Sequence, residues 1–382
     1  MRYIKLLLLA CILSAIALTS GCWNYREVDK LAIVSGLAFD RKDGKYLVTA
    51  EIVNISGGKD SKTSTELVTT EGITVFDAGR ETIKLTGKRL YYSHAEIIIV
   101  SREIAEEGIL PILDWISRDA EPRYTLHVLV SKEKSAKEIL EQRSISSEVL
   151  SFELNDILES QKSLSNAMNV EEWQFINDLS AMGISATLPT VCITKDNNKS
   201  VPEITGTGVF RKDRLVGFLD GDETKTLMFI KDKIKGGLLV DKEYNDDSRT
   251  YISLEIFRNK TTLKPYIAHG KIMIRINTDT NVAIGENGGE ENYIEEPGRS
   301  ILKKDFEAIL ENKIKNLVKE AQEQYDSDIF GFGKSVKVNL PDFWRQIESK
   351  WEQVFKTVGV EVHSTINIKN SAFESKPIKV GD

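Results

Sequence analysis

The pattern of hydrophobic and polar positions near the start of the chain predicts a β-hairpin. Residues 31–39 form a mostly apolar run, and apolar side chains recur at every second position of residues 45–53. Two such runs about a Gly-containing turn are typical of a hairpin. A third strand is predicted at residues 66–76, and Asp77 is placed to cap the helix that follows.

Strands and helices then mix without strict alternation. Short apolar runs predict strands at residues 95–100 and 124–131. Helical patterns occupy residues 102–108, 111–118, 135–142 and 147–168, and a helix capped by Asn169 whose apolar face carries Val170, Trp173, Ile176 and Leu179. Ser135 and Glu138 have the spacing of a capping box. This mixture favours an α+β fold over a doubly wound parallel sheet.

From residue 184 onward strands predominate. Their predicted positions are residues 184–194, 203–210, 215–219, 250–257 and 270–276. The last two are expected to pair with each other. A helix is predicted at residues 224–233, and the Gly-rich residues 285–298 are expected to form a loop.

The clearest helix lies in the last third of the chain. Residues 300–325 carry a stripe of apolar side chains at steps of three and four: Leu302, Phe306, Leu310, Ile314, Leu317, Ala321 and Tyr325. Such a stripe is far more often a core face than a groove for a partner. A second helix is predicted from Pro341, with Trp344, Ile347, Trp351 and Val354 on one face, and a closing strand runs from Val358 to Ile368.

These elements suggest three mixed α/β domains after a cleaved lipoprotein signal peptide. The expected division is a signal peptide at 1–21, an N-terminal α+β domain at 22–190, a small β-rich domain at 191–262, a C-terminal α+β domain with the long helix at 263–374, and a tail at 375–382. A chain of 382 residues is long enough for several separate cores.

The first 22 residues indicate export and lipid attachment. Arg2 and Lys5 precede thirteen apolar or small residues, at 6–18, which are too few for a confident membrane span. Small residues then lead to Cys22, as in a bacterial lipoprotein signal, in which the cysteine becomes the acylated first residue. The usual Leu three places before the cysteine is replaced by Thr19. An ordinary cleaved signal, or an uncleaved anchor with Cys22 incidental, is the alternative.

Two aromatic residues follow the predicted lipidation site directly. Trp23 and Tyr25 have ring systems with a polar edge, which favours the membrane interface. Packing of both rings on the first domain is the equally weighted alternative. A diacylglyceryl group has two chains, so attachment through Cys22 would be stable.

Composition excludes several functional classes. The formal charge is −7 and becomes −9 once Arg2 and Lys5 leave with the signal, which argues against nucleic acid as a partner and against electrostatic adhesion to anionic lipid. The cysteines are Cys11, Cys22 and Cys192. Removal of Cys11 and acylation of Cys22 leave Cys192 alone, so no intrachain disulfide is expected.

No catalytic or cofactor-binding pattern in the sequence is complete. The histidines, His94, His127, His269 and His363, are widely spaced and lack partners at metal-ligand spacing. The sequence Gly-Lys-Ser at 333–335 ends like a phosphate loop, but Asp328 stands where that loop needs its first Gly. Residues 220–223 lack the ligands of a calcium loop. No enzyme, metal or cofactor is therefore predicted, and no ligand-binding residue can be named.

An ordered set of short segments resembles one known family. The segments are residues 21–28, 93–100, 118–119, 206–210, 215–219 and 327–333, followed by Trp344 and Trp351. In this order they resemble the Ger(x)C family, the C-subunit lipoproteins of bacterial spore germinant receptors. The resemblance covers nearly the whole chain, although no single segment is decisive.

The resemblance implies a function without catalysis. A C subunit works beside two membrane subunits, A and B, at the outer face of the spore inner membrane, and supports nutrient-triggered germination; contact with the germinant itself is left open. The family implies three α+β domains, and it transfers only Cys22, as the lipidation site. A solute-binding lipoprotein that captures a nutrient is the main alternative, and an anchored envelope hydrolase is a weaker one.

Overall fold

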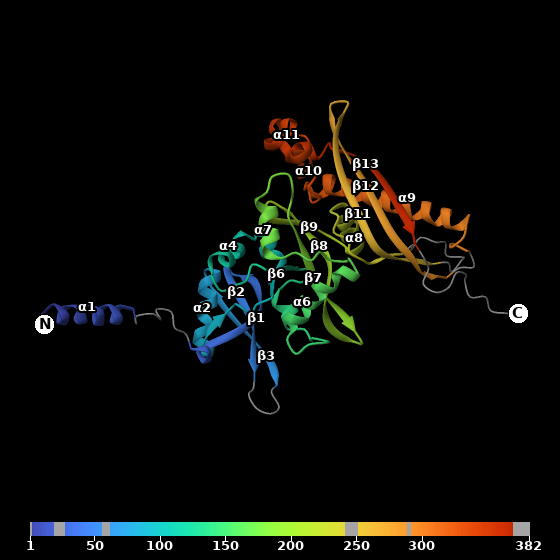
Figure 1. The fold of residues 1–382 in the computed structure, drawn as a ribbon. Coiled ribbons are helices and arrows are strands. Elements are labelled where there is room, and N and C mark those ends of the chain that lie inside the picture. Colours follow the sequence, from blue (N-terminus) through green and yellow to red (C-terminus); the bar gives the residue numbers. More distant parts are fainter. Residues whose placement is uncertain (1, 19–26, 56–61, 241–250, 289–291, 370–382) are drawn as a thin grey trace.

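The computed structural model describes residues 2–18, 27–55, 62–240, 251–288 and 292–369, and it is organised around two β-sheets (Figure 1). Within these residues the larger sheet has nine strands, in the order β3-β2-β1-β5-β6-β7-β8-β9 with β4 beside β1, and the smaller sheet has the order β10-β11-β12-β13. The predicted α+β class is confirmed.

The larger sheet is parallel in its centre and antiparallel at both sides. The parallel strands are β1 (Leu31–Lys42), β5 (Ile97–Val100), β6 (His127–Ser131) and β7 (Thr187–Asp196), and the short β4 (Arg89–Tyr91) runs parallel to the start of β1. The antiparallel strands are β2 (Lys45–Ile55) and β3 (Thr63–Gly72) on one side, and β8 (Lys199–Arg211) and β9 (Arg214–Leu219) on the other. The predicted first hairpin is therefore confirmed.

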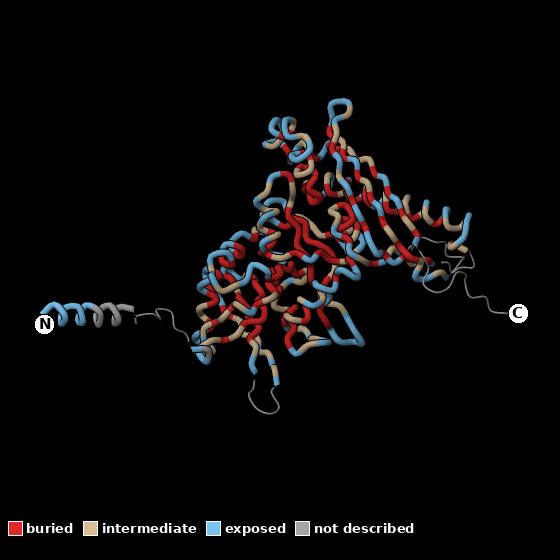
Figure 2. Tube along the Cα trace, in the orientation of Figure 1, coloured by how far each residue is buried: buried red, intermediate tan, exposed pale blue. Residues whose placement is uncertain are grey.

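Helices cover both faces of this sheet. Alternate residues of β5 point to different cores: Ile98 and Val100 pack with one set of helices, while Ile97 and Ile99 pack with another. The first set is α2 (Val75–Thr86), α3 (Arg102–Glu107), α4 (Leu110–Arg118) and α7 (Glu172–Ser180), and the second is α5 (Lys137–Leu140) and α6 (Leu150–Ser160). Burial on both faces explains why β5 is apolar throughout, and Figure 2 shows this buried centre.

Carboxylates from neighbouring strands cap both helices of the second set. Asp40 of β1 accepts hydrogen bonds from the backbone N–H groups of Ala136 (2.6 Å) and Lys137 (3.0 Å) at the start of α5. Glu51 of β2 accepts from the N–H groups of Leu150 and Ser151 (both 3.0 Å) at the start of α6. Negative charge at a helix N-terminus satisfies free N–H groups and complements the helix dipole.

Several predicted helix boundaries were wrong because the capping group is a different residue. Thr74, not Asp77, caps α2, so the third strand ends at Gly72. The N-cap of α5 is Ala136, and α5 is only four residues long; Ser135 donates to Asp40 and accepts from the N–H of Lys137 (3.2 Å), which Asp40 also binds. The predicted helix at 147–168 is α6 followed by the 3-10 turn Gln161–Ser163.

The helix predicted after Asn169 also begins on another residue. Glu171 and Gln174 form the capping box of α7. Trp173 was expected on the buried face of this helix, but its side chain is 44% exposed. Phe175 lies in the core instead.

The smaller sheet is built on a long hairpin. Strands β11 (Ile252–Ala268) and β12 (Lys271–Asn287) pair antiparallel, the short β10 (Leu238–Val240) borders β11, and β13 (Gly359–Ile368) runs parallel to β12. The helix α9 (Gly298–Glu320) lies against β13 and continues into the π-helical turn Ala321–Tyr325. All seven residues of the predicted apolar stripe are buried, which confirms that the stripe is a core face.

Side chains of α9 also protect the free edge of the smaller sheet. Glu307 accepts a hydrogen bond from the N–H of Ile366 (2.9 Å), and Glu311 accepts one from the N–H of Ser364 (3.0 Å). Unpaired N–H groups on an edge strand invite pairing with another chain. The two glutamates remove that opportunity at the centre of β13.

Short helices join the two sheets. Helix α8 (Gly221–Ile230) packs on β8 and β9 and also contacts α9 and β11. After α9 come α10 (Phe332–Asn339), α11 (Pro341–Ile347), the 3-10 turn Glu348–Lys350 and α12 (Trp351–Phe355). The expected boundary after residue 190 falls within β7 and that after residue 262 within β11, and the division into three domains stays a prediction.

Candidate functional site

The segment at residues 327–333, one of those that carried the family resemblance, forms a buried helix cap. Asp328 is 4% exposed, and its carboxylate accepts hydrogen bonds from the N–H groups of Gly331 (2.9 Å), Phe332 (3.0 Å) and Gly333 (2.8 Å). The indole N–H of Trp351 donates to the same carboxylate (3.1 Å). A side-chain carboxylate thus accepts from the N–H groups at the start of α10 that could otherwise bind an anion.

Burial decides the ionisation of this carboxyl group. Desolvation raises the pKa of Asp328 to about 6, although the four hydrogen bonds act in the opposite direction. Ionised Asp328 is therefore less favourable in the folded chain than in water. The cap is consequently sensitive to pH close to neutrality.

The capped segment is attached to the larger sheet by close backbone contact. The N–H of Lys334 donates to the carbonyl of Gly183 (2.9 Å), and the N–H of Ser185 donates to the carbonyl of Asp328 (2.7 Å). A Cβ atom on Gly333 would lie 2.4 Å from the Cα of Gly183, which itself has φ +81°. Only glycine fits at these two positions.

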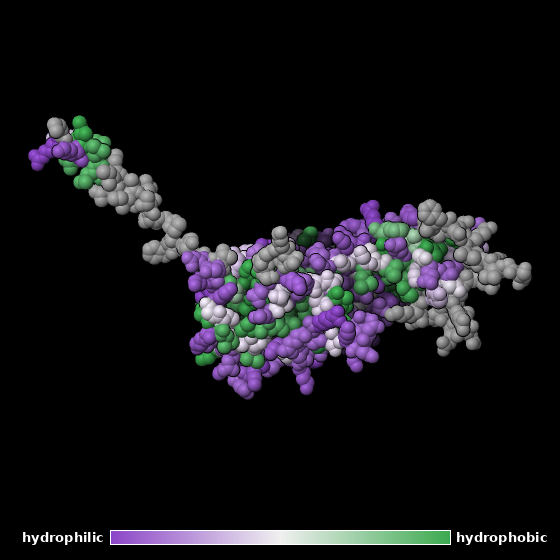
Figure 3. Space-filling model, turned by 90° about the horizontal axis from the view of Figure 1, so that it is seen from below, coloured by the Kyte–Doolittle hydropathy of each residue, from purple (hydrophilic) through white to green (hydrophobic). Residues whose placement is uncertain are grey.

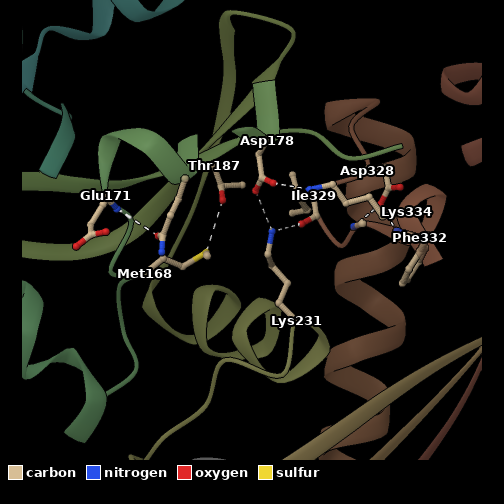
Figure 4. A network of polar contacts seen from close by, with 11 residues as sticks. Met168, Glu171, Asp178, Thr187, Lys231, Asp328, Ile329, Phe332 and Lys334 are labelled. Carbon is tan, nitrogen blue, oxygen red and sulfur yellow. Dashed lines mark hydrogen bonds and ion pairs between the residues drawn. The ribbon is translucent and has the colours of Figure 1, made fainter. Parts of the chain in front are cut away.

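Three charged side chains extend this contact (Figure 4). Asp178 of α7 lies between two lysines: its Oδ1 is 2.7 Å from Nζ of Lys334 and its Oδ2 is 3.8 Å from Nζ of Lys231. Lys231 also donates to the carbonyl of Ile329 (3.1 Å), next to the capping residue. Burial lowers the pKa of Lys231, while the negative charge of Asp178 partly offsets that effect.

A cavity of about 600 Å³ opens beside these charges. It is bordered by the end of α6, by α7, by the end of α8 and the residues after it, and by the start of α10. Met168, Val170 and Met228 supply an apolar wall, while Lys231 and Lys334 line the polar side. Its volume is within the range of small-molecule sites.

No local sequence pattern indicates this arrangement. Asp178 and Lys334 belong to the helices α7 and α10, Lys231 follows the end of α8, and residues 178 and 334 are 156 positions apart. Only the way these helices pack brings the three charged side chains together.

The histidines lie on separate elements. His94 is exposed and its ring contacts Tyr91 edge-on, whereas His127 is buried and its Nε2 is 2.6 Å from Oδ1 of Asn169. His363 pairs with Glu361, and His269 lies in the turn after β11. Among the described residues no group of His, Cys, Asp and Glu side chains is placed to hold a metal ion.

Other segments of the family resemblance also have structural roles. The ring of Tyr325, at the end of the α9 stripe, lies against Gly217 of β9, where a Cβ atom would be 2.3 Å from the ring. The Tyr325 hydroxyl donates to the carbonyl of Phe218 (3.1 Å). Trp344 and Trp351 are both buried, with ring centroids 5.4 Å apart. The contacts of Tyr325 with β9 join the two halves of the chain, and the tryptophan pair packs within the C-terminal half.

The predicted membrane residues, Cys22, Trp23 and Tyr25, lie outside the described residues. The preceding segment contains the helix α1 (Arg2–Leu18). No helix in the described parts of the chain combines the length and apolar character needed to cross a membrane.

Comparison with known proteins identifies the family. Residues 24–193 match the spore germination protein N-terminal domain, and residues 205–372 match the C-terminal domain described as spore germination B3/GerAC like. Similar proteins of Bacillus subtilis (strain 168) include spore germination protein B3, 24% identical over 92% of this chain and 94% of that protein, and spore germination protein KC, 22% identical over 98% of each.

A solved structure has the same fold. The crystal structure of the GerBC protein matches with a TM-score of 0.57 and 20% identity, over 87% of this chain and 96% of that one. The two matched domains together cover nearly all of the sequence. The chain therefore belongs to the Ger(x)C family of spore germination proteins, as the ordered segments predicted.

Proposed function

We propose that the chain is the non-catalytic, lipid-anchored C subunit of a spore germinant receptor. In this role it assembles with the membrane subunits A and B at the outer face of the spore inner membrane and supports the response to nutrients. The match of both family domains over residues 24–193 and 205–372 carries the proposal. The names of the relatives support germination rather than an enzymatic reaction.

The surface offers places for contact with other subunits. Hydrophobic residues gather in patches between hydrophilic ones on the face shown in Figure 3. On and beside α2, Ile73, Phe76 and Leu85 are 75%, 50% and 67% exposed. Exposed apolar groups of this kind are common at protein interfaces. Tethering of all subunits to one membrane raises their effective concentration, so contacts of moderate strength suffice.

Dipicolinate release from spores that lack the chain tests the role in germination. We expect loss of the response to one group of nutrients, with lysozyme-triggered germination intact. A normal response to every single nutrient, in spores that also lack the related receptors, would contradict the proposal. Co-purification of the A and B subunits with the tagged chain tests assembly separately.

Substitution of the predicted lipidation site tests the anchor. Cys22→Ala should release the chain from membrane fractions and weaken germination, because no acyl chain can then be attached. Cys192→Ala is the matched control, since this partly buried thiol is the other cysteine expected in the mature chain. Unchanged membrane retention of Cys22→Ala would remove the lipid from the mechanism.

The cavity favours a second candidate function, capture of a small solute by an anchored binding protein. Its volume of about 600 Å³ and its combination of apolar and charged walls suit a small molecule. The two functions are compatible, because a receptor subunit can also bind a ligand.

A further inference from the structure

The charge of the cavity is opposite to that of the chain. Five lysines line it, against three carboxylates, whereas the whole chain has a formal charge of −7. The lysines are Lys162, Lys231, Lys233, Lys235 and Lys334. A concave surface focuses such an excess of positive charge and attracts anions.

The carboxylates of the cavity are already engaged. Asp178 is shared by Lys231 and Lys334, Glu159 accepts a hydrogen bond from Asn169 (2.9 Å), and Glu171 accepts one from the indole of Trp173. Neutral donors leave the charge of Glu159 and Glu171 in place, so five lysines against three carboxylates give the cavity an excess of two positive charges.

Three of the lysines are free to bind a ligand. Within the described parts of the chain, Lys162, Lys233 and Lys235 form no ion pair, and all three are exposed residues of the cavity lining. Lys231 lies deeper, with its side chain 10% exposed, and has three N–H groups. One donates to the carbonyl of Ile329 (3.1 Å), and the carboxylate that Lys231 shares with Lys334 is 3.8 Å away.

The apolar part of the lining suits a hydrocarbon group. Met168, Val170 and Met228 are each 6% exposed, and Ile184 is partly buried beside them. Methionine side chains adapt their shape to an apolar ligand. A ligand with charge alone would leave this wall unused.

We propose that the cavity binds a small organic anion, with its carboxylate or phosphate group toward Lys231, Lys233 and Lys235 and its apolar body against Met168 and Met228. The juxtaposition of an excess of lysines and an apolar wall in one cavity carries this inference. It rests on the second candidate function, solute capture in this cavity, and names the class of solute; it does not require that the chain act in germination.

Calorimetric titration of the full chain in a neutral detergent tests the site. The probes are 3-phenylpropanoate and phenyl phosphate, which have both a charge and an apolar body. The neutral 3-phenylpropanamide has only the body, and acetate and inorganic phosphate have only the charge. We expect saturable one-site binding of the first two, and weaker binding of the other three. Higher salt should weaken the binding of the anions, because exposed charges are screened.

Charge reversal at the cavity mouth gives the decisive comparison. The double variant Lys233→Glu, Lys235→Glu should bind the two anions about tenfold more weakly or worse, since like charges then face each other. The matched control is Lys195→Glu, Lys199→Glu, at two exposed lysines of the β7–β8 hairpin, which changes the net charge equally. Because both double variants are titrated in the same detergent, heat from partition of the probes into detergent is equal in the two titrations and does not affect the comparison.

Three results would overturn the proposal. They are equal binding of the amide and the carboxylate, equal loss of affinity in the two double variants, and absence of saturable binding by either aromatic anion. Each is independent of germination assays, so failure of the anion site and failure of the receptor role can be told apart.

Discussion

Replacement of Asp328 by Asn tests the buried cap most directly. The substitution keeps the shape of the side chain and one oxygen, which still accepts from the N–H groups of Gly331 and Phe332. The new amide nitrogen takes the place of Oδ2, so the N–H of Gly333 and the indole N–H of Trp351 face a donor. Each buried donor without an acceptor costs about 1–3 kcal/mol, so for these two donors we expect a destabilisation of about 2–6 kcal/mol near pH 7.5.

The pH dependence of this difference follows from the raised pKa. Asp328 has a pKa of about 6 in the folded chain, against 3.8 for the unperturbed group. The folded state therefore takes up a proton as the pH falls through about 6, while the unfolded state does so only near 4. The stabilisation that comes from this proton uptake is fully present below the pKa of Asp328 in the unfolded state, and it is lost as the pH rises through about 6. As the pH falls from about 7.5 to 5, the free energy of unfolding of the chain with Asp328 should rise by about 1.4 kcal/mol relative to that of Asp328→Asn.

Two measurements check the reasoning. Urea unfolding followed by tryptophan fluorescence gives the difference in stability at each pH, and hydrogen exchange of the 329–340 peptide reports on the cap itself. Asp326→Asn is the control, because Asp326 forms only partly exposed ion pairs with Arg211 and Lys356 and should change stability by about 1 kcal/mol or less. If the stability difference between the native chain and Asp328→Asn stays constant or decreases toward pH 5, the pKa of Asp328 is not raised. If hydrogen exchange of the 329–340 peptide is the same in both, Asp328 does not cap α10.

Three further substitutions address the contact between the two halves, the core face of α9 and the edge of the smaller sheet. Gly333→Ala should lower the melting temperature and increase exchange around α10, because its Cβ atom would lie 2.4 Å from Gly183. Leu310→Asp should unfold the C-terminal half, since Leu310 is 3% exposed; an unaltered thermal melt would contradict burial of the stripe. Glu307→Ala should cost about 1–3 kcal/mol and increase light scattering on storage, because it leaves the N–H of Ile366 unpaired on the sheet edge.

Periodicity predicted the long elements that have one apolar face. The stripe from Leu302 to Tyr325 repeats over about six helical turns, and a pattern of this length predicts the helix from local sequence alone. The hairpin of β11 and β12 was predicted to pair but to be much shorter. Its middle carries buried polar residues, where Thr280 donates to Asn259 (2.9 Å) and Asn259 to Thr261 (3.0 Å). A search for apolar alternation cannot recognise a strand whose inward side chains bond to one another.

Helix α10 was missed for a different reason. It starts with Phe332 and Gly333 just after Gly331, and glycine disfavours a helix. Four hydrogen bonds to Asp328 and contact with Gly183 supply the stabilisation that the local sequence lacks. The segment was identified from family resemblance, but its role became apparent only when these distant residues were seen together.

The same physics explains how an acidic chain tolerates carboxylates in its cores. Asp40, Glu51 and Asp328 are all buried, and each accepts two or more N–H groups at the start of a helix. The N–H groups and the helix dipole partly replace the water that each carboxylate loses. Helices as short as α5 and α10 are not stable alone, so they depend on these acids. Asp40 and Glu51 are about a hundred residues from the helices they cap, and helix starts that rest on such partners cannot be located from local sequence.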